Sequence, residues 1–162
     1  MAPMLAAALF GAAPACALAT EIVGPVARVP SGDTLVVTDG ARDVEVRLAD
    51  IGAPQGGEFY APAARTLLAS IVAGKAVRVE VTGSGGEGRV FGRVFAGELD
   101  VNLELVRRGA AWMCIEYAAN LNLLPHENDA QRHKRGLWAQ TSQFDARVEC
   151  RRRPPAAKPA GY

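Results

Sequence analysis

Hydrophobic and polar residues alternate along much of the chain, in short runs that are separated by turn-forming residues. The alternation is clearest at residues 44–48 and 77–81, where every second side chain is apolar. A two-residue period predicts a β-strand with one buried face. Three more short apolar runs lie between glycine, proline and aspartate turn signals, at residues 22–29, 34–37 and 90–96. The pattern therefore predicts five short strands.

A helical period replaces the alternation in three places. Residues 61–73 put four apolar side chains on one helical face, with a proline in the first turn and a glycine after the end. Residues 101–108 and 129–135 predict two further short helices, each followed by a glycine. Three helices packed on a five-stranded barrel give a mainly-β fold with α, of the oligonucleotide/oligosaccharide-binding (OB) type.

The two ends of the chain differ from this body. Residues 1–19 predict a signal peptide, because they carry no charged side chain, contain a short apolar stretch and end in Ala-Leu-Ala. The folded domain is then expected at residues 20–140, exported to the periplasm or secreted. An ordinary first helix and a lipid anchor at Cys16 are alternatives. Residues 141–162 predict a basic, Pro/Ala-rich flexible tail.

Length and charge narrow the range of functions. A chain of 162 residues predicts one domain. Its net charge of +1 argues against strong nonspecific attraction to DNA or to an anionic membrane, so binding of a polyanion would need a local cluster of cations. After the leader, no segment is long and apolar enough to predict a membrane span.

Two cysteines, Cys114 and Cys150, remain after the predicted leader is removed. Export to an oxidising compartment would allow them to form a disulfide. The alternative is two unpaired thiols, one of them buried, because spacing along the chain does not place two Cα atoms within bonding range.

Three short motifs carry candidate chemistry: Gly32-Asp33-Thr34, Arg47 on a predicted strand, and Phe91-Gly92-Arg93. In this order and spacing they resemble the staphylococcal nuclease-like (thermonuclease-like) family, over roughly residues 26–138. The resemblance implies that Asp33 and the backbone carbonyl of Ala53 would be metal ligands, with calcium as the cofactor. It also implies that Arg47 and Arg93 would stabilise a phosphate group and that nucleic acid would be the partner.

The chain departs from the family pattern at two acidic positions. After the strand arginine the family typically has a second metal-binding aspartate and then a glutamate that orients or activates water, and these positions are Gly52 and Gln55 here. An amide can hydrogen-bond a water but cannot accept its proton as a carboxylate does. Calcium binding is therefore expected to be weak or lost. Asp50, two residues before Gly52, would face the same side of an extended strand and is a doubtful substitute ligand.

Other roles are open for the retained residues. Asp33 could be a turn residue that bonds its own backbone, and Arg47 could belong to a structural ion pair. Three functions remain for the chain as a whole. It could be a catalytically impaired module that binds phosphate-containing ligands or nucleic acid, an active calcium-dependent phosphodiesterase on DNA or RNA, or a noncatalytic interaction module of the cell envelope.

Overall fold

A computed structural model of the protein describes residues 21–40, 42–140 and 150. The predicted leader at residues 1–19 and, apart from Cys150, the predicted tail at residues 141–162 lie outside the described residues. Both assignments therefore stay predictions.

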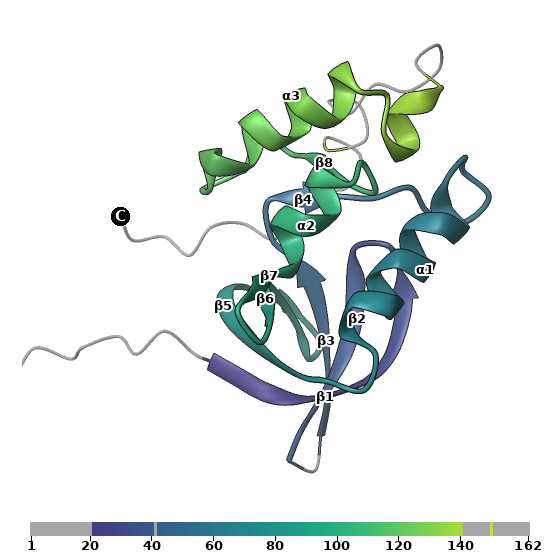
Figure 1. The fold of residues 1–162 in the computed structure, drawn as a ribbon. Helices are drawn as coiled ribbons and strands as arrows, with labels where there is room; N and C mark the ends of the chain where they lie inside the picture. The colour runs from purple at the N-terminus through teal and green to yellow at the C-terminus, as the bar shows by residue number, and fades with distance from the viewer. Residues whose placement is uncertain (1–20, 41, 141–149, 151–162) are drawn as a thin grey trace, which may run out of the picture.

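Five strands form a closed mixed barrel (Figure 1). They follow the order β3-β2-β1-β5-β6, and the barrel closes because β3 also pairs with β6, in parallel. The interior is filled by branched aliphatic side chains that alternate along the strands with outward-facing residues, as the two-residue period predicts. The predicted barrel is confirmed. Its strands are β1 (Glu21–Ser31), β2 (Thr34–Asp39), β3 (Arg42–Leu48), β5 (Ala76–Gly86) and β6 (Arg89–Ala96).

Three shorter strands extend this frame. β7 (Leu99–Asp100) pairs with β6 at the edge of the sheet, and β4 (Ile51–Gly52) pairs with β8 (Trp112–Met113) in a separate two-stranded ribbon. The ribbon joins the segment that follows β3 to the segment that follows the second helix.

Helices cover the barrel at one end. α1 (Ala61–Val72) packs on β1, and α2 (Val101–Arg107) packs on β6 and on α3 (Leu124–Arg132). Two single-turn 3-10 helices, η1 (Leu121–Leu123) and η2 (Gly136–Ala139), flank α3. Among the described helices, none combines the length and apolar character that a bilayer span requires.

The predicted position of the third helix is wrong. The sequence pattern placed it at residues 129–135, whereas α3 begins at Leu124 and ends at Arg132. Pro125 occupies the first turn of the helix, where its missing N–H has no intrahelical partner to lose. The end comes early because Lys134 has a left-handed φ of 50°.

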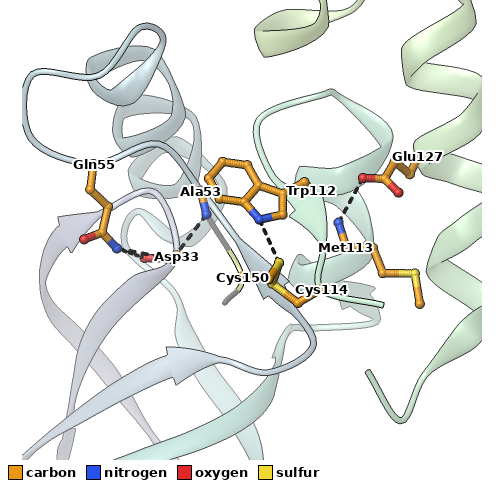
Figure 2. The surroundings of a disulfide bond; sticks show 8 residues. All are labelled: Asp33, Ala53, Gln55, Trp112, Met113, Cys114, Glu127 and Cys150. Carbon is orange, nitrogen blue, oxygen red and sulfur yellow. Dashed lines mark hydrogen bonds between the residues drawn. A yellow bond between two sulfur atoms is a disulfide. The ribbon is translucent and has the colours of Figure 1, made fainter. Parts of the chain in front are cut away.

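A second, smaller apolar cluster lies beside the β4–β8 ribbon. It contains Trp112, Ala130, Leu137, Trp138 and the Cys114–Cys150 disulfide, whose Cα atoms are 5.5 Å apart. The indole Nε1 of Trp112 donates a hydrogen bond to Cys150 Sγ at 3.2 Å (Figure 2). The disulfide thus attaches residue 150 to the residue directly after β8.

We expect reduction of this disulfide to lower the stability of the domain. A crosslink between cysteines 36 residues apart should contribute about 3 to 4 kcal/mol to the free energy of unfolding. Urea unfolding with and without dithiothreitol measures this. The Cys114→Ser/Cys150→Ser variant is the control and should unfold at the same urea concentration in both conditions. Equal stability of the oxidised and reduced wild-type protein would contradict the prediction.

Candidate functional site

The parallel pairing that closes the barrel places two predicted phosphate arginines on one face. Arg47 of β3 is in register with Phe91 of β6, and Arg93 follows two residues later, on the same side of β6 as Phe91. Strand spacing and rise put the backbones of Arg47 and Arg93 about 8 Å apart. The Arg47 guanidinium lies 5.9 Å from the centre of the Phe91 ring. Both arginines therefore face the outer side of the β3–β6 seam.

Asp33 lies next to this seam, in the turn between β1 and β2, and is completely buried. The following residue, Thr34, is in register with Arg47. The Asp33 carboxylate accepts hydrogen bonds from the Ser31 hydroxyl at 2.8 Å and the Thr34 hydroxyl at 3.2 Å. The Ala53 backbone N–H donates to Oδ2 at 3.2 Å. Part of this is the local turn bonding that the sequence allowed for an aspartate here.

The side chain of Gln55 makes the contact that most directly occupies the Asp33 carboxylate. Its side-chain Nε2 donates to both Asp33 oxygens, at 3.1 and 3.3 Å (Figure 2). The amide thus lies directly against the carboxylate that the family resemblance names as a metal ligand. Its own backbone N–H is held by Glu58 Oε2 at 2.7 Å, which fixes the start of the loop that leads to α1. A neutral donor and a carboxylate form a stable pair without an added charge.

Gly52 leaves no space for a side chain. A Cβ atom there would lie 2.8 Å from Trp112 Nε1 and 2.9 Å from Cε2, closer than real Cβ contacts. Trp112 is itself fixed by β8 and by its hydrogen bond to Cys150. The indole therefore occupies the volume that a carboxylate at residue 52 would need.

Asp50 does not fit the role of substitute ligand that strand periodicity suggested. It lies in the turn between β3 and β4 with a left-handed φ of 66°, so the rule that alternate residues face the same side does not apply. Its Oδ1 accepts the Ala119 N–H at 2.9 Å, and its carbonyl accepts the Cys114 N–H. These contacts hold the segment after β8 against the turn.

Arg93 is engaged by a carboxylate that the sequence analysis missed. Its Nε and Nη2 donate to Asp100 Oδ2 at 2.9 and 2.6 Å, and its side chain remains 40% exposed. Asp100 Oδ1 accepts the Leu103 N–H and so caps the N-terminus of α2. An N-cap aspartate could have been found from its place before an apolar run, but its contact with Arg93 depends on the β6–β7 hairpin.

Asn102 is a second residue that the sequence analysis missed. Its Oδ1 accepts the Val94 N–H at 3.1 Å, and its Nδ2 donates to the Ala49 carbonyl at 2.9 Å. This buried amide joins α2 to β6 and to the turn after β3, next to Arg93. A polar residue among buried positions of a short helix is the signal that could have found it.

The described side chains do not fit a calcium ion. Calcium takes six to eight oxygen ligands, several of them anionic. Asp33 is surrounded by hydrogen-bond donors, and the described residues contain no group of three acidic, histidine or cysteine side chains with metal-site spacing. Whether the Ala53 carbonyl is a ligand stays a prediction from the resemblance.

A family model and several known proteins match most of this chain. A family model described as staphylococcal nuclease homologue matches residues 45–140. The chain belongs to the staphylococcal nuclease family. It is 38% identical over 123 residues to an "Uncharacterized endonuclease" of Escherichia coli, covering 75% of this chain and 80% of that protein. It is also 32% identical over 127 residues to a "Micrococcal nuclease" of Shigella flexneri, covering 72% and 73%. The family resemblance read from the sequence is confirmed.

In this member of the staphylococcal nuclease family, a buried carboxylate on α3 also supports the β4–β8 ribbon. Glu127 of α3 accepts the Met113 N–H at 3.1 Å (Figure 2). Burial raises the pKa of Glu127, and the hydrogen bond from Met113 opposes that shift. The carboxylate therefore carries its charge less readily in the folded chain than in the unfolded one.

The Gly52→Ala variant should be destabilised by about 1 to 3 kcal/mol, because its methyl group overlaps the Trp112 indole. Thermal or urea unfolding measures the loss. Gly57→Ala is the matched control, since a Cβ at Gly57 meets no atom within 4 Å. Equal stability of the two variants would show that Trp112 can move away.

The Glu127→Gln variant should change how stability depends on pH. The folded-state pKa of Glu127 is raised. The contribution of Glu127 to the free energy of unfolding is therefore full below the ordinary glutamate pKa and is lost as pH rises through the folded-state pKa. Glutamine keeps the acceptor for Met113 and cannot ionise. The stability of the variant relative to wild type should therefore increase as pH rises above the ordinary glutamate pKa. A pH-independent difference in urea unfolding would contradict this.

Proposed function

We propose that this member of the staphylococcal nuclease family binds the phosphate groups of nucleic acid through Arg47 and Arg93 and hydrolyses phosphodiesters weakly or not at all. Family membership supports a nuclease-type fold and nucleic acid as the class of ligand. The hydrogen bonds from the Gln55 amide to the Asp33 carboxylate carry the argument against efficient catalysis. In this proposal the protein acts outside the cytoplasm, in keeping with the leader-like residues 1–19.

Phosphodiester hydrolysis places two demands on such a site. Charge that builds on the phosphate must be stabilised, and an attacking water must be positioned and deprotonated. Arg47 and Arg93 can serve the first demand, because guanidinium groups match the geometry of phosphate oxygens. The second demand is not met by Gln55, which has no proton-accepting carboxylate.

Calcium would ordinarily supply further stabilisation in this family. Staphylococcal nuclease homologues are typically calcium-dependent, and a hard cation is held by anionic oxygens. A cation at Asp33 would have to displace the Gln55 amide and would gain no carboxylate at Gly52. These two features support weak calcium binding.

Asp100 sets the affinity of the arginine pair in this proposal. Two of the five N–H groups of Arg93 are directed at Asp100 Oδ2, so an incoming phosphate meets a nearby negative charge. The Arg47 guanidinium lies toward the Phe91 ring, on the same outer face.

The alternative function is an active, calcium-dependent phosphodiesterase on DNA or RNA. The retained aspartate and arginines and the similarity to a protein named micrococcal nuclease favour it. It requires Gln55 to leave Asp33 when a cation and substrate bind. If the protein neither cleaves nor binds nucleic acid, the third function applies, a noncatalytic interaction module of the cell envelope.

The deciding experiment incubates the purified protein with labelled single-stranded DNA and RNA, in calcium and in chelator. We expect little or no cleavage in either condition and measurable, salt-sensitive binding by fluorescence anisotropy. The Arg47→Gln/Arg93→Gln variant should lose most of this binding, because both phosphate donors are gone. Arg28→Gln/Arg42→Gln removes the same charge from exposed positions and should bind as wild type. Calcium-dependent cleavage that Asp33→Ala abolishes would establish the alternative.

A matched single substitution tests the role of Asp100. Asp100→Asn removes the charge that faces Arg93 but keeps an oxygen to cap α2. Removal of a partly exposed ion pair worth about 0.5 to 1 kcal/mol should raise the affinity for the oligonucleotide roughly two- to fivefold. Unchanged or weaker binding would show that Arg93 does not receive phosphate.

A further inference from the structure

Five cationic side chains gather where α2 and α3 end. Arg107 and Arg108 lie at the end of α2, and Arg132, Lys134 and Arg135 lie at the end of α3. Four of them are exposed, and Arg135 is half-buried. We propose that these five residues, the helix-end cluster, form a second surface that binds the phosphodiester backbone of nucleic acid.

The backbone holds the two helix ends together. The Leu137 N–H donates to the Gly109 carbonyl at 2.8 Å, and a side chain at Gly109 would collide with the Arg135 carbonyl oxygen. Arg135 Nη1 also donates to the Arg107 carbonyl at 3.2 Å. The cations of α2 and α3 are therefore parts of one rigid surface and not two separate helix ends.

Two carboxylates beside the helix-end cluster orient its arginines. Glu104, whose side chain is 6% exposed, accepts from both arginines of α2, and these bonds lower its pKa. Asp129 accepts from both arginines at the end of α3 and also contacts His133. Both carboxylates stay ionised at neutral pH. Five cations against two carboxylates leave a local surplus of three positive charges in a chain whose net charge is +1.

The composition of the cluster favours phosphodiester over other anions. Four of its five cations are arginines, whose planar forks match phosphate oxygens and are weakly hydrated. Helix C-termini attract cations through the helix dipole, which accounts for one or two cations at each end. The helix dipole does not account for the surplus of positive charge. It also does not account for the exposure of the guanidinium groups, since Arg108 and Arg132 have half or more of their side chains exposed.

The helix-end cluster is distinct from the Arg47/Arg93 site. α2 has seven residues, so about 10 Å separates its N-cap Asp100, which pairs with Arg93, from Arg107 at the other end. The inference therefore holds whether or not the Arg47/Arg93 site receives a phosphate. A nucleic acid longer than a few nucleotides could contact both surfaces.

The test variant is Arg108→Gln/Arg132→Gln/Lys134→Gln. It removes three exposed cations but leaves Arg107 on Glu104 and Arg135 on Asp129, so neither carboxylate loses its last arginine. The control, Arg28→Gln/Arg42→Gln/Lys75→Gln, makes the same change in net charge at exposed positions on β1, at the start of β3 and before β5. Thermal unfolding verifies that both variants fold.

Binding of a labelled 20-mer, as single-stranded DNA and as RNA, is measured by anisotropy across a range of salt concentrations. The test variant should bind at least several-fold more weakly, with the slope of log affinity against log salt reduced by roughly 2, or ~0.7 for each lost phosphate contact. A labelled dinucleotide, too short to span both surfaces, should bind the test variant and wild type equally. Loss of dinucleotide binding in the Arg47→Gln/Arg93→Gln variant reports the Arg47/Arg93 site separately.

Three results would overturn the inference. The first is unchanged 20-mer affinity and slope in the folded test variant. The second is an equal loss in the control variant, which would assign the effect to net charge alone. The third is that wild type binds vesicles of anionic phospholipid and the test variant does not, while the two proteins bind the 20-mer equally. This result would identify a membrane surface as the partner.

Discussion

The parallel pairing of β3 with β6 is the constraint on which the candidate site depends. It closes the barrel, and in doing so it fixes Arg47 beside Phe91 and brings Arg93 to the same outer face. The same closure places the turn after β3 where Asn102 can bond both Ala49 and Val94. If this pairing slipped by one residue, the arginines would face opposite sides of the sheet. The closure of the barrel and the placement of the two arginines are therefore inseparable at this seam.

The site is held by contacts within the protein. Gln55 satisfies Asp33, Asp100 satisfies two donors of Arg93, and Trp112 fills the space beside Gly52. The two polar contacts give partners to the buried Asp33 carboxylate and the mostly buried Asp100 carboxylate, which would be destabilising without them, and Trp112 contributes by packing. In the proposed function, each contact also opposes something that efficient catalysis requires: cation binding at Asp33, phosphate binding at Arg93, or a second carboxylate at residue 52. On that proposal, contacts that stabilise the fold compete with catalysis for the same atoms.

Much of this arrangement was predictable from local patterns. The two-residue period and short apolar runs between turn signals located the five barrel strands, and helical periodicity with glycine and proline signals located α1 and α2. The third helix was misplaced, because the pattern gave no weight to Pro125 as a first-turn residue. The family motifs identified Asp33, Arg47 and Arg93. The partners of these residues were not predictable, because Asp100 and Trp112 reach the site only through the β6–β7 hairpin and the β4–β8 ribbon.

The indole beside Gly52 has a consequence for how this sequence can change. Replacing Gly52 by aspartate introduces a side chain where Trp112 already stands, so the substitution is harmful while the tryptophan is present. Replacing Trp112 first would remove the indole that donates to Cys150 from the smaller apolar cluster. Either single replacement is therefore expected to lower the stability of the folded protein. The close packing of Trp112 on Gly52 couples the two positions, so an aspartate at residue 52 would need a smaller side chain at residue 112.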